Sequence, residues 1–383
     1  MSKKHKIVNG LVFREEGSFE PATVYLCDDR IVSEDTYLAS EAPEALTDAE
    51  GCYVIPGLTD IHFHGCMGSD CCDGTEEAFR VIAQYELRQG VTSITPATMT
   101  MSEDVLAGIC RSAKDFSCAD GADFCGLYME GPFISPAKKG AQNEKYICPA
   151  DTEMLKRLQQ ASGGLIRTVT VAPEAEGAMD FIRENSANIN ISLAHTTADY
   201  ETAKEALSCG ASQLTHTYNA MMPFSHRAPG PIGAAADSSH CMAELICDGI
   251  HIHPAVVRTT FKIFGDDRII LISDSMRAAG LEDGEYDLGG QTVTVRGNLA
   301  VLTDGTIAGS VTNLMDCVRT AVHDMGIPLA SAVKCAAVNP AKAVGIYHDY
   351  GSLTPGKYAN IVLLDQNLDL KAVFHRSDIV LSN

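Results

Sequence analysis

The sequence lacks the features that would direct this protein to a membrane or to nucleic acid. It contains no run of 18 or more apolar residues, so no transmembrane helix is expected. Basic residues are scarce, because 29 Lys and Arg stand against 50 Asp and Glu, and a net charge of −21 repels polyanions at long range. The opening residues Met1-Ser2-Lys3-Lys4-His5-Lys6 lead into a strand-like stretch and not into the apolar segment of a signal peptide. We therefore expect a cytoplasmic protein with no membrane and no nucleic acid partner.

Two common cofactor signatures are also missing. No phosphate-binding P-loop and no Gly-x-Gly-x-x-Gly motif occurs, so nucleotide-cofactor chemistry has no support. The 14 cysteines include no Cys-x-x-Cys pair of the kind found in structural zinc sites. Cys66, Cys71 and Cys72 lie close together, but adjacent cysteines do not easily ligate one tetrahedral ion. We interpret them as loop thiols and expect free cysteines throughout.

The length and composition are those of a folded protein. With 383 residues, 45% hydrophobic and 21% charged, the chain can bury a large core. Between Tyr53 and Met325, short β-branched apolar runs alternate with helical patterns, which is typical of βα units. The runs are Val54 to His64, Val91 to Ala97, Phe124 to Glu130, Leu165 to Val171, Ile189 to Ala194, Ser212 to His216, Ala243 to Cys247 and Arg268 to Ser273. The clearest helical patterns are Thr75 to Gln89, Asp151 to Ala161, Asp199 to Ser208, Pro254 to Phe264 and Asn313 to Met325. Eight units predict an α/β fold of the (β/α)8 TIM-barrel type.

The two ends of the chain have a different pattern. Short strands in hairpins are expected at the start, at Lys6 to Phe13 with an Asn9-Gly10 turn, Thr23 to Leu26 and Arg30 to Val32, and at the tail, at Asn360 to Leu364 and Ala372 to His375. Neither end could bury a core alone. We predict that residues 1–55 and 351–383 form one small β-sandwich domain, that residues 56–350 form the barrel, and that a β-rich insert near residues 286–307 follows the eighth barrel strand.

Candidate metal ligands stand at the ends of several predicted strands. His62 and His64 end the first, and residues two apart on a strand point to the same face. A His-x-His motif alone is as often two polar residues at a strand end as a metal site. Other candidates stand at the same end of four further strands, namely Glu130, His195, His216 and Asp274. Because the carboxyl ends of barrel strands converge on one face, this set predicts a metal site there.

The kinds of ligand indicate the chemistry. Imidazole and carboxylate groups without an obligatory thiolate suit Zn²⁺, with Fe²⁺, Mn²⁺ or Co²⁺ as alternatives. A metal-bound water ionises near neutral pH, and Asp274 is placed to accept that proton and return it to a leaving group. Arg227 follows the sixth strand and His251 the seventh, which is compatible with an anion pocket on the same face, although the sequence alone slightly favours a surface ion pair for Arg227. The pattern predicts a hydrolase of amides or esters.

Several motifs resemble one family, the N-acetylglucosamine-6-phosphate deacetylases of the amidohydrolase superfamily, over essentially the whole chain. They are Pro56-Gly57-Leu58-Thr59-Asp60-Ile61-His62-Phe63-His64-Gly65, Met129-Glu130-Gly131-Pro132-Phe133, Leu193-Ala194-His195-Thr196, Thr215-His216-Thr217-Tyr218-Asn219-Ala220-Met221, Asp248-Gly249-Ile250-His251, Ser273-Asp274-Ser275-Met276-Arg277-Ala278-Ala279-Gly280 and Ala308-Gly309-Ser310. The His-x-His motif serves the superfamily generally, whereas the Asn-Ala-Met and Asp-Ser-Met-Arg-Ala segments are specific to these deacetylases.

The resemblance implies a distorted barrel with a terminal β-sandwich, usually as a homodimer. It implies the removal of acetate from N-acetyl-D-glucosamine 6-phosphate, a step of amino-sugar catabolism. Asp274 matches the catalytic acid/base. Glu130, His195 and His216 match the principal metal ligands, and His62 and His64 match members with two metal ions, so one or two ions per chain are implied, bridged by Glu130. The matching substrate-binding positions are Ala141, Gln142, Asn219, Ala220, Arg227, His251, Ile307, Ala308 and Gly309.

One departure from the family and three alternatives remain. Some relatives have a histidine where this chain has Gln142. Because Gln carries no proton to transfer, polarisation of the substrate's amide carbonyl should depend more on the metal. An N-acetylgalactosamine-6-phosphate deacetylase would act on a substrate that differs only at the sugar C4 hydroxyl. A cyclic-amide hydrolase usually carries a Lys where Glu130 stands. A metal-binding scaffold without turnover would not need Asp274.

Overall fold

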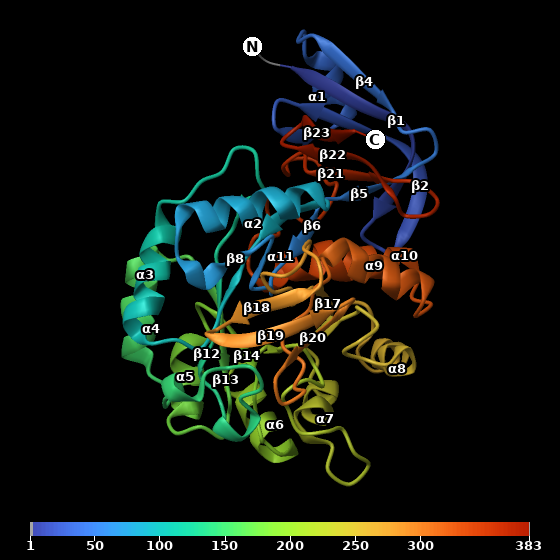
Figure 1. Ribbon diagram of the computed structural model, residues 1–383. Coiled ribbons are helices and arrows are strands. Elements are labelled where there is room, and N and C mark those ends of the chain that lie inside the picture. The colour runs from blue at the N-terminus through green and yellow to red at the C-terminus, as the bar shows by residue number, and fades with distance from the viewer. Residues whose placement is uncertain (1–2, 383) are drawn as a thin grey trace.

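The structure, a computed structural model, describes residues 3–382, so Met1, Ser2 and Asn383 of the predicted terminal domain lie outside the described residues. It has two parts, a barrel of parallel strands wrapped by helices and a sheet that combines both ends of the chain (Figure 1). No helix among the described residues is long and apolar enough to span a membrane.

All eight predicted barrel strands are present. They are β6 (Leu58–Asp60), β9 (Val91–Ile94), β12 (Leu127–Phe133), β13 (Ile166–Val171), β14 (Asn190–Leu193), β15 (Gln213–Leu214), β16 (Met242–Ile246) and β17 (Ile269–Ile272). With β10 (Ala97–Thr98), the strands β12 to β17 form one parallel sheet, and in another β9 lies between β6 and β11 (Asp123–Phe124) and pairs with both. The Asp274 amide donates to the His62 carbonyl at 3.0 Å, which joins the last strand to the first. The predicted TIM-type fold is confirmed.

The first predicted strand is wrong in its extent. Val54 to His64 divides into β5 (Tyr53–Pro56), which belongs to the terminal sheet, and β6 of the barrel. The break falls at Gly57, where an added Cβ would lie 2.2 Å from the Oγ1 of Thr92. The chain therefore crosses from the terminal sheet to the barrel at a position where only glycine fits.

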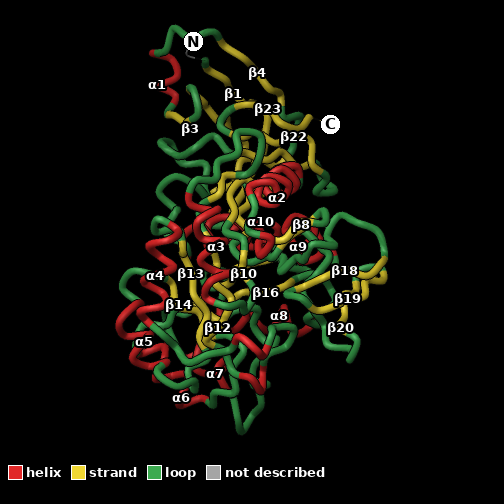
Figure 2. The backbone as a smooth tube through the Cα atoms, turned by 60° about the vertical axis from the view of Figure 1, so that its left-hand side comes forward, coloured by secondary structure: helices red, strands yellow, loops and turns green. Residues whose placement is uncertain are grey.

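The five predicted helices are confirmed, four with the expected polar residue at the start and α8 with Pro254. They are α2 (Glu76–Arg88), α4 (Thr152–Ser162), α6 (Tyr200–Ser208), α8 (Pro254–Phe264) and α9 (Leu314–His323). Thr75, Asp151, Asp199 and Asn313 cap four of them through side-chain oxygens that accept backbone N–H groups. The other helices are α1 (Glu34–Ala39), α3 (Glu103–Lys114), α5 (Ala178–Asn185), α7 (Gly230–Asp237), α10 (Leu329–Val333) and α11 (Asn339–Ala343). Figure 2 shows α3 to α6 on the outer side of the barrel strands, whereas α1 lies beside strands of the N-terminal segment.

The terminal sheet joins strands from both ends of the chain, as predicted. It comprises β1 (Lys4–Arg14), β2 (Ser18–Cys27), β3 (Arg30–Val32), β4 (Glu44–Asp48), β5, β21 (Ile361–Leu364), β22 (Leu370–His375) and β23 (Asp378–Ser382). The predicted Asn9-Gly10 turn is wrong. Asn9, at a φ of 57°, lies inside β1 at a break in register with β2, so this dipeptide forms a bulge and not a hairpin turn.

The predicted β-rich insert is a three-stranded meander, β18 (Gly284–Leu288), β19 (Gln291–Arg296) and β20 (Leu299–Leu302). It packs its own apolar cluster against the carboxyl face of the barrel, where Met99 and Met276 contact it. A short hairpin, β7 (Gly65–Cys66) with β8 (Ser69–Asp70), follows the His-x-His segment. The insert forms one wall of the cavity described next.

Candidate active site

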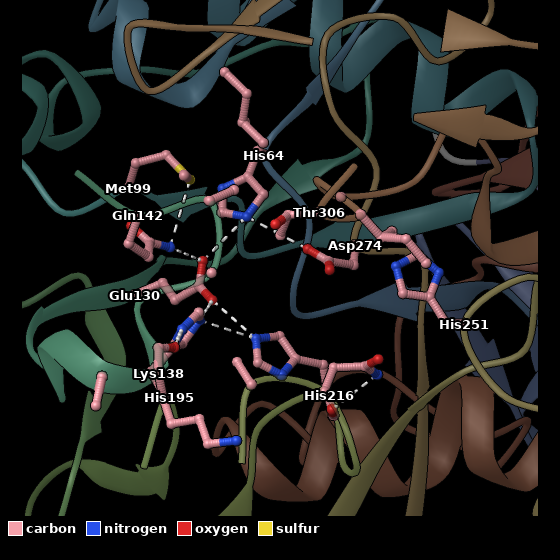
Figure 3. Close-up of a pocket in the computed structure, with 18 residues that line it drawn as sticks. His64, Met99, Glu130, Lys138, Gln142, His195, His216, His251, Asp274 and Thr306 are labelled. Carbon is pink, nitrogen blue, oxygen red and sulfur yellow. Dashed lines mark hydrogen bonds and ion pairs between the residues drawn. The ribbon is translucent and has the colours of Figure 1, made fainter. Parts of the chain in front are cut away.

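The carboxyl ends of the barrel strands open into a cavity of about 390 Å³ (Figure 3). Every strand-end candidate except His62 lines it, and His62 lies fully buried directly behind. His62 and His64 follow β6 and are not part of the strand, so the predicted alternation along a strand is not what places them. Glu130 lies inside β12 and not at its end, because the strand continues to Phe133.

Glu130, His195 and His216 form the first ligand group. The Oε1 atom of Glu130 lies 2.9 Å from Nε2 of His195 and 3.1 Å from Nε2 of His216, and the two imidazole nitrogens are 3.2 Å apart. All three side chains are buried. Three donor atoms that converge in this way are suited to hold a divalent cation.

A second ligand group, His62, His64 and Asp274, shares the same carboxylate. The other oxygen of Glu130, Oε2, lies 3.1 Å from Nε2 of His64 and 3.7 Å from Nε2 of His62. Asp274 Oδ1 lies 3.4 Å and 3.8 Å from the same two nitrogens. His62 Nε2 is buried and has no hydrogen-bond partner, which fits a position that a metal ion would occupy. Glu130 therefore lies between two groups of potential ligands, one at each oxygen.

The outer nitrogens of three imidazoles are held by other groups. Nδ1 of His62 contacts Oε2 of Glu244 at 2.9 Å, and Nδ1 of His195 contacts the Lys138 carbonyl at 2.8 Å. The His64 Nδ1 contacts the Ala97 carbonyl at 3.3 Å. These contacts direct each Nε2 atom toward Glu130 and favour the tautomer that ligates a metal.

Glu244 is a functional residue that the sequence reasoning missed. It lies in β16, fully buried, and its Oε2 atom also accepts the backbone N–H of His216 at 2.9 Å. It thus supports one ligand of each group. The available signal was a lone acidic residue inside an apolar strand, since a carboxylate is rarely buried there without a partner.

Unusual backbone geometry also marks the site. His195, His216 and Asp274 have φ values of 45°, 27° and 48°, in the left-handed region that non-glycine residues seldom adopt. Each lies two residues beyond the last residue of its strand. Such conformations cost of order 1–3 kcal/mol each and persist where the surrounding structure holds them in place. Here they turn three side chains into the cavity.

The electrostatics of the cluster favour cations. Burial alone would raise the pKa of Glu130, but contacts with His195, His216, His62 and His64 hold it well below its usual range. Burial would lower the pKa of His64, yet Asp274 and Glu130 raise it to about 10. Burial also acts to raise the pKa of Asp274, which His64 and His62 nevertheless hold below its ordinary value. Ionised carboxylates surrounded by nitrogens are suited to bind divalent metal ions.

Most of the predicted substrate-binding residues line the cavity. They are Ala141, Gln142, Asn219, Ala220, His251, Ile307 and Gly309. Ala308 does not line it, because its side chain is fully buried in the apolar cluster of the insert. Arg227 does not line it either; it is exposed in the loop between β15 and α7 and forms no ion pair among residues 3–382.

Gln142 is held by the protein at both ends of its amide. Its Nε2 donates to Glu130 Oε2 at 2.7 Å, and its Oε1 accepts the Thr100 N–H at 2.7 Å. The side chain is 2% exposed. The donor that a substrate carbonyl would need is thus engaged by Glu130, so in this structure Gln142 orients the carboxylate shared by the two ligand groups.

Comparison with known proteins identifies relatives with this architecture. The amidohydrolase family model matches residues 53–381. The N-acetylglucosamine-6-phosphate deacetylase of Bacillus subtilis (strain 168) is 38% identical over 332 residues, 85% of this chain and 84% of that protein. The N-acetylgalactosamine-6-phosphate deacetylase of Escherichia coli O157:H7 is 34% identical over 335 residues, 87% of this chain and 89% of that protein. A mutant N-acetyl-D-glucosamine-6-phosphate deacetylase from Mycobacterium smegmatis, solved in complex with N-acetyl-D-glucosamine-6-phosphate, superposes with a TM-score of 0.87 at 29% identity, covering 100% of this chain and 99% of that one.

Proposed function

This chain belongs to the amidohydrolase family, and we propose that it hydrolyses N-acetyl-D-glucosamine 6-phosphate to D-glucosamine 6-phosphate and acetate. One observation carries the proposal. Two groups of potential metal ligands meet at Glu130, and Asp274 belongs to the second of them, in a cavity lined by further polar groups. This arrangement is suited to bring water, an amide carbon and a proton acceptor together.

The metal would be divalent, with one or two ions per chain. Glu130, His195 and His216 would hold one ion, and His62 and His64, with Oε2 of Glu130, the other. Zn²⁺ suits these ligands best, with Fe²⁺, Mn²⁺ or Co²⁺ as alternatives. When bound, the metal supplies a Lewis acid that polarises the amide carbonyl and acidifies water.

Asp274 would carry out the two proton transfers of the reaction. Its carboxylate is ionised at neutral pH, because nearby imidazoles hold its pKa low. It accepts a proton from the attacking water and returns that proton to the amine nitrogen as the C–N bond breaks. The Asp274 N–H donates to the His62 carbonyl at 3.0 Å, and its own carbonyl accepts from Ser310 at 2.7 Å. The backbone thus holds the carboxylate in place through both steps.

The sugar 6-phosphate would lie near Ala220 and His251. The Ala220 N–H has no acceptor among the described residues, whereas the N–H of Asn219 already donates to the His216 carbonyl at 2.9 Å. His251 is anchored by Asp248, whose Oδ2 lies 2.7 Å from Nδ1 and leaves Nε2 free for the ligand. The similarity to an N-acetylgalactosamine-6-phosphate deacetylase keeps the C4 epimer as a second candidate substrate.

We further propose a cytoplasmic homodimer. Met222 and Phe224 are 37% and 48% exposed in the loop that carries Arg227, and apolar side chains exposed together favour a protein contact. Arg227 lies outside the cavity of its own subunit, so in a dimer it would serve the phosphate site of the partner subunit. The sheet of residues 1–55 and 351–383 and the barrel of residues 56–350 are proposed as the two domains.

The test is direct. The purified protein is incubated with N-acetyl-D-glucosamine 6-phosphate, and acetate and new primary amine are measured together. We expect equal amounts of the two products, formation that stops when a chelator removes the metal, and recovery when Zn²⁺ is restored. Metal binding without any acetate release would instead identify a scaffold without turnover.

A further inference from the structure

Lys138 is the one lysine or arginine among the described residues that lines the cavity. It lies in the short helical turn Pro136–Lys138 after β12, and in Figure 3 its side chain extends away from Glu130. The other charged groups that line the cavity are carboxylates and imidazoles. In a chain of net charge −21, a single ammonium group in this position requires an explanation.

The backbone of Lys138 is fixed to His195, which lies just beyond β14. Its carbonyl accepts from Nδ1 of His195 at 2.8 Å, and its N–H donates to the Ser135 carbonyl at 3.0 Å. The Ser135 N–H in turn donates to the His195 carbonyl at 2.9 Å. The ammonium group, by contrast, forms no ion pair with any carboxylate of residues 3–382. The residue is therefore held in place while its charge stays available.

The same loop lies against the proposed phosphate site. A Cβ added at Gly140 would lie 3.9 Å from the Cβ of Ala220 and 3.4 Å from Cε1 of His195. Ala220, at a φ of 50°, has a backbone N–H without an acceptor and lines the same cavity as Lys138. An unpaired cation and a free backbone amide that line the same cavity are suited to bind a phosphoryl group.

We propose that Lys138 is the cation that each subunit supplies to its own bound 6-phosphate, and that it determines the preference for phosphorylated sugars. The inference rests on the proposed function. It differs from the expected role of Arg227, which lies outside the cavity of its own subunit. Lys138 would act within one chain, so its contribution would not depend on a partner.

The neighbouring residue provides a matched control. Lys139 carries the same charge on the same loop but does not line the cavity. Its ammonium lies near Asp304, where, after the stronger effect of the Thr306 N–H, it helps to lower the pKa of that carboxyl. Lys138→Met and Lys139→Met therefore remove equal charge from positions one residue apart. Lys138→Arg keeps the charge and Lys138→Gln keeps a polar side chain if the methionine variant does not fold.

The experiment compares these variants by steady-state kinetics and by competitive inhibition with inorganic phosphate, after metal content and melting temperature have been matched. We expect Lys138→Met to raise KM for N-acetyl-D-glucosamine 6-phosphate and the inhibition constant of phosphate by about 10- to 100-fold. Turnover of unphosphorylated N-acetyl-D-glucosamine and the behaviour of Lys139→Met should stay within about 2-fold of wild type, and Lys138→Arg should recover part of the loss.

Equal effects of the two methionine substitutions, or equal losses for phosphorylated and unphosphorylated sugar, would overturn the role of Lys138. A wild-type protein that releases no acetate would instead overturn the proposed function. In that case the binding of inorganic phosphate, measured by calorimetry on the wild type and on Lys138→Met, still decides whether Lys138 holds the anion. No difference in phosphate binding would refute the proposal.

Discussion

Replacing Asp274 by Asn tests the assignment of the proton acceptor. The two side chains have the same shape, and the backbone of residue 274 is held by the His62 carbonyl and by the N–H of Ser310, so the fold should not change. The carboxamide keeps an oxygen where Oδ1 lies 3.4 Å from Nε2 of His64. It cannot accept a proton from water. We therefore expect metal content to stay nearly unchanged while turnover is lost.

The expected magnitude follows from the position of the side chain. Asp274 is 7% exposed, and no second carboxylate other than Glu130, which lies between the two ligand groups, lines the cavity among the described residues. No other carboxylate of the cavity is therefore free to replace it as general base. Loss of a general base costs about 10²- to 10⁴-fold in kcat, or about 2.7 to 5.4 kcal/mol in activation free energy.

The assay measures acetate release under saturating substrate, with metal content determined on the same sample. Asp237→Asn is a matched control, because Asp237 is exposed on α7 and accepts only the hydroxyl of Tyr200. The control should retain full activity. An Asp274→Asn variant that keeps more than about a tenth of wild-type kcat with its metal bound would refute the assignment.

Three other predictions test separate parts of the structure. His62→Ala combined with His64→Ala should remove one of two metal ions, whereas His195→Ala should remove the other. Metal content is measured by atomic absorption. One ion per chain in wild type, unchanged by the double substitution, would exclude the two-metal site. Arg227→Ala should reduce kcat/KM for the 6-phosphorylated sugar by about 1.5 to 3 kcal/mol with the oligomer intact, and equal losses for the unphosphorylated sugar would make Arg227 structural. Burial lowers the pKa of Lys357 to about 8 from about 10.5. Between pH 8 and 10.5, Lys357 is therefore protonated in the unfolded chain but largely deprotonated in the folded protein, so the stability of wild type should rise relative to Lys357→Met as pH rises through this range. Urea-unfolding midpoints that change with pH by the same amount in both proteins would contradict this.

The sequence was sufficient for the parts of the fold that local chemistry determines. Apolar runs placed all eight barrel strands, and capping residues such as Asp151 and Asn313 placed helix starts to within a residue. The candidate ligand residues of the sequence also lie together in the structure, because parallel strands bring their carboxyl ends to one face. These features depend on spacing along the chain, which the sequence states directly.

Other features depend on contacts between distant segments. Gly57 breaks the first strand because of Thr92, which is 35 positions away, and the Asn9-Gly10 pair forms a bulge because β2 continues beyond it. Glu244 supports the imidazole of His62 across the barrel, a contact that no local pattern indicates. The position of Arg227 outside the cavity follows from the path of a long exposed loop. Such features need the folded chain.

The central claim is tested most directly by acetate release from four sugars, N-acetyl-glucosamine and N-acetyl-galactosamine, each with and without a 6-phosphate. Reactions are run with the metal-loaded protein and repeated after chelation. The account predicts the highest kcat/KM for N-acetyl-D-glucosamine 6-phosphate, a large loss without the phosphate, and no release after chelation. Equal rates with and without the phosphate, or release that survives removal of the metal, would contradict it.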